Sequence, residues 1–135
     1  MTALEKIKKY KSFPSTLIIN GLSSLGIQVA KTLLEQKGLV IILDKYQREK
    51  KLVIEELSSF ESFVFIDIDG NEELLNKIEH LDYLIYLEND SLDKEEDLSP
   101  NEFLKKINYL NKFLEFAIKK SAKVLLTTSL KAHQI

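Results

Sequence analysis

Short, uninterrupted apolar runs recur along the chain, and polar segments whose apolar residues are three or four positions apart separate them. A continuous apolar run suits a strand that is covered on both faces, whereas a spacing of three and four indicates an amphipathic helix. The expected strands span residues 16–20, 39–43, 63–66, 83–87 and 123–128, and the expected helices span 24–37, 46–58, 71–79 and 100–120.

This alternation predicts one α/β domain built on a parallel, doubly wound sheet. Because crossover connections are right-handed, the predicted strand order is 3-2-1-4-5. The switch point then lies between the first and fourth strands, beside residues 20–21 and 87–89. Ligands of such sheets bind in the crevice beyond the carboxyl ends of the strands at that point.

Each helix is expected to turn its apolar positions toward the sheet. Residues 3–10 could form a further short basic helix or a frayed arm. Gly38 is expected to cap the first long helix, Asp69 or Asn71 the third, and Ser99 the last, which has Pro at its first position. The predicted inward residues are Leu25, Val29, Ala30, Leu33 and Leu34, then Leu52, Val53 and Leu57, then Leu74, Leu75 and Ile78, and finally Phe103, Leu104, Ile107, Leu110, Phe113, Leu114, Ala117 and Ile118.

The composition of the chain excludes several classes of chemistry and of binding partner. The 135 residues suffice for a single domain, residues 1–135, that folds without metal or disulfide, and the absence of cysteine excludes thiol chemistry. Nineteen basic and 21 acidic residues give a net charge of -2, which is no electrostatic footprint for nucleic acid or an anionic membrane. With no signal peptide and no apolar run of about 18 residues, we expect a cytoplasmic protein without membrane or nucleic-acid partners.

A glycine-bearing turn joins the first expected strand to the first long helix. Its sequence, GLSSLG, fits G-x-G-x-x-G at the outer glycines and has Ser23 in the middle. Such a turn leads onto a helix N-terminus, where N–H groups and the helix dipole attract a pyrophosphate. The expected contacts are Gly21, Ser23, Ser24, Leu25 and Gly26. Alternatively, Gly21 only makes the turn and Gly26 only lets the helix pack on the strand.

Acidic residues end the second and third strands, where the adenosine of a dinucleotide would lie. Asp44 follows the turn by about 20 residues and can accept hydrogen bonds from both ribose hydroxyls, which favours NAD over NADP. Asp67 could accept from the adenine amine, and Ile68 could pack against its ring. Each aspartate could instead be an ordinary cap.

Several stretches, in order along the chain, resemble the nucleotide-binding part of extended short-chain dehydrogenases/reductases, the family of NAD-dependent nucleotide-sugar epimerases and dehydratases. The resemblance implies a Rossmann-like fold that binds NAD(P), with Leu87 and Asn108 beside the cofactor, Ser129 at the catalytic-serine position and a homodimer through helix 100–120. The matching stretches are 20–26 (NGLSSLG), Asp44, 65–68 (FIDI), 81–87 (LDYLIYL), 107–108 (IN) and 124–129 (VLLTTS).

The chain also departs from that family. Glu88 and Asn89 stand where the family has small alanines beside the cofactor, and residues 111–112 (NK) replace its Gly-Thr. The family's Tyr-x-x-x-Lys pair follows the serine-bearing strand, beyond residue 135, so we expect a domain that is not catalytic alone. Tyr46 and Lys50 have the spacing of that pair, but they follow the second strand, and we interpret the match as coincidence.

Two other functions fit the same pattern. One is a nucleotide-sensing regulatory domain like those of potassium-transport regulators, which have G-x-G-x-x-G at this spacing, an Asp at this place and a comparable length. The other is an interaction module that kept the fold and lost its ligand. The long polar segment 88–99 and the Thr-Thr-Ser ending favour the dehydrogenase-like domain, whereas the tight turn and small size favour the regulator.

Overall fold

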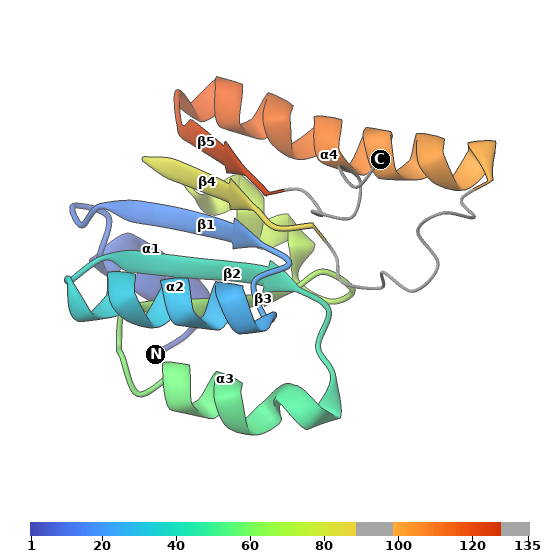
Figure 1. The fold of residues 1–135 in the computed structure, drawn as a ribbon. Helices are drawn as coiled ribbons and strands as arrows, with labels where there is room; N and C mark the ends of the chain where they lie inside the picture. The colour runs from blue at the N-terminus through green and yellow to red at the C-terminus, as the bar shows by residue number, and fades with distance from the viewer. Residues whose placement is uncertain (89–98, 128–135) are drawn as a thin grey trace.

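A computed structural model describes residues 1–88 and 99–127, in which helices and strands alternate along the chain (Figure 1). The elements are α1 (Ala3–Lys9), β1 (Ser15–Ile19), α2 (Ser24–Glu35), β2 (Leu39–Asp44), the 3-10 turn η1 (Arg48–Lys50), α3 (Lys51–Leu57), β3 (Phe63–Asp67), the 3-10 turn η2 (Glu72–Lys77), β4 (Tyr83–Tyr86), α4 (Pro100–Lys120) and β5 (Lys123–Leu126).

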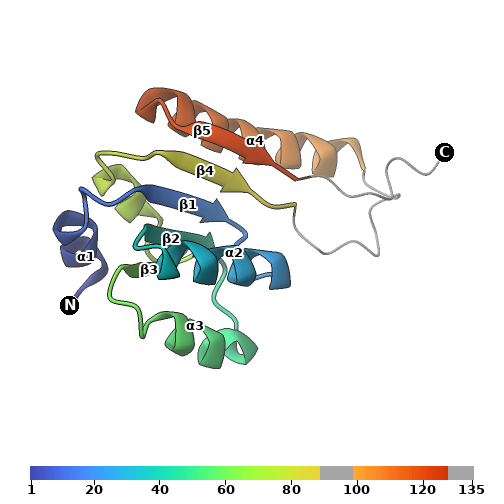
Figure 2. The same cartoon turned by 60° about the vertical axis from the view of Figure 1, so that its left-hand side comes forward.

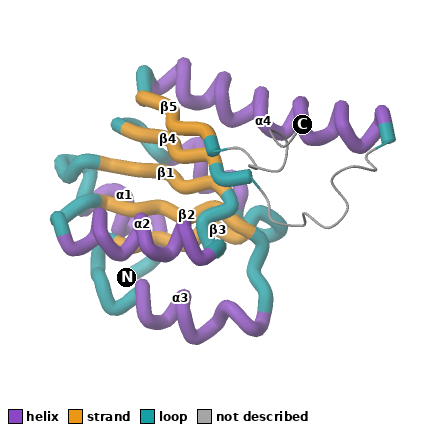
Figure 3. The backbone as a smooth tube through the Cα atoms, viewed as in Figure 1, coloured by secondary structure: helices purple, strands orange, loops and turns teal. Residues whose placement is uncertain are grey.

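The five strands are parallel and lie in the order β3-β2-β1-β4-β5, which confirms the predicted doubly wound sheet. β1 is central, and its Ile18 pairs with Ile42 of β2 and Ile85 of β4. Helices α2 and α3 cover one face, while α1, η2 and α4 cover the other (Figure 2). The carboxyl ends of all strands therefore lead into loops at one edge (Figure 3).

The sheet is most completely buried along β1 and β2. Leu17 and Ile19 pack on the α1 and α4 side, whereas Ile18 packs on the α2 and α3 side, and none of the three has measurable exposure. Successive strand residues point to opposite faces, and here both faces are covered by helices. That double cover explains why these strands show continuous apolar runs rather than alternation.

The N-terminal segment forms a helix and not a frayed arm. Ile7 of α1 is buried in the core. The Lys6 ammonium donates to the carbonyl oxygen of Phe63 at 3.0 Å, and Lys9 pairs with Glu61 at 2.6 Å. These contacts fasten α1 to the start of β3.

Helix α4 has its predicted bounds because both signals at its start are strong. Ser99 caps it in a reciprocal capping box with Glu102, and Pro100 takes the first position. The packing is different from the prediction, because Phe113 and Ala117 are the buried residues of α4. Its N-terminal half extends past the carboxyl edge of the sheet, beyond the ends of the five described strands (Figure 1).

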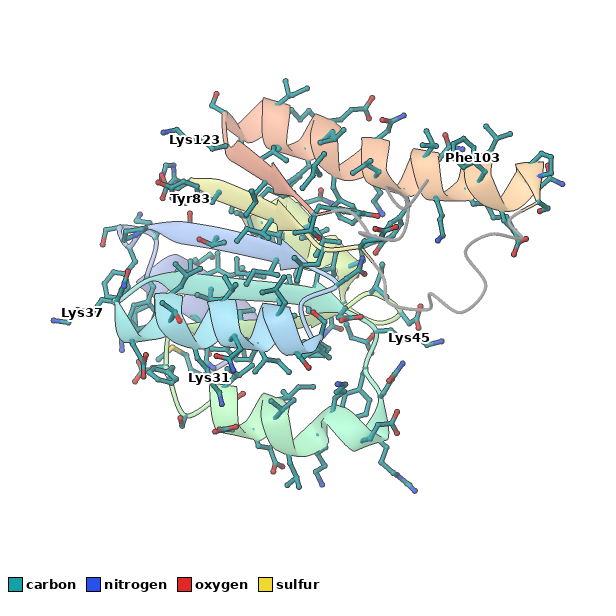
Figure 4. The ribbon with its side chains drawn as sticks, in the orientation of Figure 1. Lys31, Lys37, Lys45, Tyr83, Phe103 and Lys123 are labelled. Carbon is teal, nitrogen blue, oxygen red and sulfur yellow. The ribbon has the colours of Figure 1, made fainter. Side chains whose placement is uncertain are left out.

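That overhang leaves predicted inward residues in solvent. Phe103, which Figure 4 labels, and Leu104 are more than half exposed, at 55% and 56%. Ile118 is 77% exposed and lies near the other end of α4, away from the overhang. Helical periodicity identifies an apolar stripe, but it does not tell how far the sheet extends beneath it.

The prediction of inward-facing leucines is also wrong at two positions on α2 and α3. Leu25 of α2 is 54% exposed and Leu52 of α3 is 78% exposed, whereas Leu57 is fully buried. Leu52 and Leu57 are five positions apart and therefore lie on different sides of a helix. The second helix also begins later than predicted, because η1 precedes α3.

Helix ends deviate from the predicted caps. At the end of α2, Lys37 and not Gly38 has the left-handed φ of 63°, while the Gly38 N–H donates to the Leu33 carbonyl at 3.0 Å. The third predicted helix is the 3-10 turn η2, and Asn71 before it makes no side-chain cap. Asp67 supplies the local hydrogen bonds instead, since its carbonyl accepts the N–H groups of residues 70 and 71.

β5 is an edge strand, and its four residues are all exposed. Leu125 is 58% exposed, although the apolar run predicts burial on both faces. The described part of the chain places α4 partly on one side of β5 and no helix on the other (Figure 2).

Within residues 1–88 and 99–127, no helix is both long and apolar enough to cross a membrane.

The packing of α3 yields a matched stability test. We expect Leu57→Ala to lower the free energy of unfolding by about 2–5 kcal/mol, because it removes a fully buried side chain and leaves a cavity. Leu52→Ala on the same helix should change it by less than about 0.5 kcal/mol. Urea denaturation of both variants measures the difference, and equal losses would contradict the packing described.

Candidate functional site

The turn after β1 is held by Asn20. Its backbone has a left-handed φ of 61°, a conformation that Asn tolerates better than most residues. Its N–H donates to the Leu43 carbonyl of β2 at 2.8 Å, and its side-chain amide donates to the Leu87 carbonyl at 2.7 Å. Asn20 thus connects the carboxyl ends of three strands at the switch point, a role that its place in the sequence did not reveal.

The two glycines of the turn allow close packing beneath it. A Cβ atom on Gly21 would lie 2.9 Å from Cγ2 of Ile42, and one on Gly26 would lie 2.3 Å from the Gly21 carbonyl oxygen. These contacts set the start of α2 directly on the turn. The contact at Gly26 agrees with the packing role considered for that glycine, and the predicted phosphate contacts stay a prediction.

Ser23 fits the middle position of the motif without strain. Its φ of -74° and ψ of 166° are extended, so its backbone does not require glycine. Its hydroxyl oxygen caps α2 by accepting from the Gly26 N–H at 3.1 Å, which leaves the hydroxyl proton available to another acceptor. The missing middle glycine therefore does not distort this turn.

The first turn of α2 presents free N–H groups at the crevice. Within residues 1–88 and 99–127, the N–H groups of Ser24 and Leu25 have no hydrogen-bond acceptor. They belong to the first turn of a 12-residue helix, whose dipole places partial positive charge there. Such a terminus can bind a phosphate oxygen.

Asp44 lies beside this helix start. Its Oδ2 accepts from the Leu22 N–H at 2.9 Å, and its Oδ1 accepts from the Lys45 N–H at 2.6 Å. The side chain is half-buried, and each oxygen retains capacity for another donor. The carboxylate is therefore oriented by the turn and can accept hydroxyl groups from a ligand.

Asp67 and Ile68 are committed partly to local structure. Asp67 Oδ1 accepts from the Asp69 N–H at 3.1 Å, and the Ile68 N–H donates to the Asp44 carbonyl at 3.0 Å. Ile68 is half-buried against the core. The Asp67 side chain holds the turn after β3 and does not cap a helix, and the predicted adenine contacts stay a prediction.

The remaining predicted site residues do not all lie near the turn. Leu87 is buried, with its carbonyl bound by Asn20. Asn108 is exposed on α4. Ser129, the predicted catalytic serine, lies outside the described residues. The structure thus gathers the turn, Asp44 and Leu87 at the carboxyl edge of the sheet, and it does not bury Asn108 there.

An aromatic pair lines the α4 side of the same edge. Tyr109 meets Tyr86 edge-on at 6.3 Å between ring centroids and packs on Phe113 at 4.9 Å. Burial, followed by the charges of Tyr86 and Asp44, raises the pKa of Tyr109, so its hydroxyl stays protonated at neutral pH. Sequence reasoning missed Tyr109, although its spacing of four from Phe113 on a helix was a signal.

Glu88 completes the crevice beyond β4. Its N–H donates to Oγ1 of Thr127 at 3.2 Å, and the Thr127 N–H donates to the Tyr86 carbonyl at 3.1 Å. Burial and the nearby Glu88 charge raise the pKa of Tyr86. A carboxylate is therefore held where β4 and β5 end.

A cluster at the opposite edge is structural. His80 Nε2 lies 2.9 Å from Asp82 Oδ1, and Ser15 donates its N–H to Asp82 Oδ2 at 2.9 Å. The Ser15 hydroxyl donates to the His80 carbonyl and not to its ring, so imidazole cannot activate it as a nucleophile. In the described part of the chain, no group of three or more acidic or histidine side chains could hold a metal.

Solved structures share this fold, although no family model and no curated protein matches the sequence. ElxO with NADP bound and an ElxO variant with NADPH bound each match with a TM-score of 0.58 and 23% identity over 90% of this chain. A short-chain dehydrogenase from Oenococcus oeni PSU-1 matches with a TM-score of 0.50 and 22% identity over 89% of this chain.

These likenesses define the class of fold, which is a Rossmann-like doubly wound parallel sheet. The chain spans 58% of the ElxO chain and 64% of the Oenococcus oeni chain.

The contact between α2 and the turn can be tested by stability. We expect Gly26→Ala to lower the free energy of unfolding by about 1–3 kcal/mol, because backbone atoms of Gly21 occupy the space that a Cβ needs. Gly70→Ala is the control, since the nearest atom to its Cβ would be 3.6 Å away. The control should leave stability unchanged or raise it by up to about 1 kcal/mol. Thermal unfolding of both variants measures this, and a tolerated Gly26→Ala would contradict the close approach.

Proposed function

We propose that this chain is the NAD(P)-binding domain of a protein of the short-chain dehydrogenase type. The observation that carries the proposal is the pairing of free N–H groups at the start of α2 with the Asp44 carboxylate beside them. The first suits a pyrophosphate and the second suits a ribose. The NADP in ElxO, on the same fold, supports a nicotinamide dinucleotide in this crevice.

Within that class we favour the extended, nucleotide-sugar epimerase and dehydratase group, with NAD over NADP. The support for the group is the order of matching motifs along the sequence. The support for NAD is Asp44, whose charge would repel the 2′-phosphate of NADP. Lys45 beside it is exposed and points into solvent (Figure 4).

Binding without turnover is the role we propose for these residues by themselves. Burial raises the pKa of both Tyr86 and Tyr109, which disfavours either as the proton-transfer partner near neutral pH. Among residues 1–88 and 99–127, neither tyrosine hydroxyl hydrogen-bonds a lysine ammonium.

Calorimetric titration with NAD and NADP tests the site. We expect the wild type to bind NAD more tightly than NADP, and Asp44→Ala to weaken NAD binding by about tenfold or more, because two hydrogen bonds to a charged acceptor are lost. Glu35→Gln, an exposed carboxylate at the far end of α2, should leave both affinities unchanged.

Three outcomes would contradict parts of this proposal. Failure of the wild type to bind either dinucleotide at millimolar concentration would favour an interaction module. Tighter binding of NADP than NAD would overturn the role of Asp44. Full NAD affinity in an Asp44→Ala variant that folds normally would place the ligand elsewhere.

We further propose that α4 pairs with α4 of a second copy of this chain. Phe103, Ile107, Leu114 and Ile118 are spaced by four, seven and four positions, which brings them to one side of the helix, beside the stripe that packs on the sheet. Most of these side chains are exposed in a single chain. Pairing would cover an apolar surface that solvent otherwise contacts.

Sedimentation velocity tests the pairing. We expect a dimer for the wild type and a monomer for Ile107→Glu, because a charge would be buried in the apolar contact. Lys105→Glu, an exposed change on another side of α4, should remain dimeric. A wild type that stays monomeric at high micromolar concentration would contradict the proposal.

A further inference from the structure

Glu88 is fixed in place by its neighbours on both sides. Its own N–H donates to Oγ1 of Thr127 at 3.2 Å, just beyond β5. The preceding residue, Leu87, donates its N–H to the Ile19 carbonyl at 3.1 Å and accepts the Asn20 amide at 2.7 Å. The main chain at Glu88 is therefore held where β1, β4 and β5 end.

The carboxylate of Glu88 lacks a partner on one side. Its Oε2 atom is buried, and no donor within residues 1–88 and 99–127 reaches it. A buried carboxylate oxygen without a donor or a nearby cation is costly, so it calls for an explanation, and a bound cationic group would supply one. Ser24, Leu25 and Asp44, the other candidate ligand groups, lie on the β1 and β2 side of the crevice.

The part of the ligand that would meet Glu88 follows from the fold, and this step rests on the proposed function. A dinucleotide bound across the switch point has its pyrophosphate at the start of α2 and one nucleoside on the β2 side, at Asp44. The second nucleoside must then extend over the ends of β4 and β5. Glu88 lies two residues beyond β4, on that side.

We propose that Glu88 makes this crevice bind the oxidised nicotinamide dinucleotide more tightly than the reduced one. The oxidised nicotinamide ring carries a positive charge, and the reduced ring is neutral. A carboxylate with a buried oxygen attracts the charged ring through a medium of lower dielectric than water. A ring in that position would also provide the unpartnered Oε2 with an opposite charge.

The test compares affinities for the two redox forms. NAD⁺ and NADH are titrated separately into the wild type and into Glu88→Gln, which keeps the size of the side chain and removes its charge. We expect the dissociation constant for NAD⁺ to rise about five- to tenfold in Glu88→Gln, and that for NADH to change by less than about twofold. The control is Asp69→Asn, which removes an exposed charge shortly after β3. It should leave the dissociation constants for NAD⁺ and NADH unchanged.

Each alternative result has a distinct meaning. Equal changes for NAD⁺ and NADH, or no change, would overturn the role of Glu88 while leaving dinucleotide binding intact. Tighter binding of both forms by Glu88→Gln would show that the carboxylate repels the phosphates, and it would also overturn the role. If the wild type binds neither form, the proposed function fails together with this inference. Circular dichroism establishes that each variant is folded.

Discussion

The left-handed turn at Asn20 is the constraint on which the crevice depends. One residue donates from its backbone to β2 and from its side chain to the residue after β4, so it sets the separation of three strand ends. The same reversal delivers the chain to Gly21, whose backbone packs directly against Gly26 in the first turn of α2. A residue that could not adopt this φ or donate from its side chain would leave the switch point unsupported.

Groups of opposite charge follow one another across the carboxyl edge of the sheet. Asp44 offers acceptors on the β2 side, the start of α2 offers positive partial charge in the middle, and Glu88 offers a negative charge beyond β4. A ligand with hydroxyl groups, an anionic bridge and a cationic ring, in that order, would complement all three. This complementarity connects the proposed function with the further inference about redox preference.

The helices cover the strands of the sheet unequally, and this determines which apolar surfaces remain exposed to solvent. β1 and β2 are buried on both faces, whereas Leu125 on β5 and Tyr83 on β4 are exposed, and half of α4 extends beyond the sheet. Apolar residues on the overhang contribute nothing to the core of a single chain. Their exposure is consistent with a surface that another chain covers, which is the basis of the proposed pairing through α4.

The apolar runs, the cap at Ser99 and the turn at Gly21 were enough to predict the strands, their order and the position of Asp44, because local spacing and right-handed crossovers leave few alternatives. Periodicity could not tell that Leu52 faces solvent or that β5 lies uncovered at an edge, since exposure depends on what packs nearby. The right-handed crossovers predicted that residues 20 and 88 lie near one switch point, but the contacts made there came only from the tertiary structure. The amide of Asn20 reaches the Leu87 carbonyl, and Tyr109 of α4 packs on Tyr86 of β4, because the sheet and its covering helix bring together residues that are distant in the sequence.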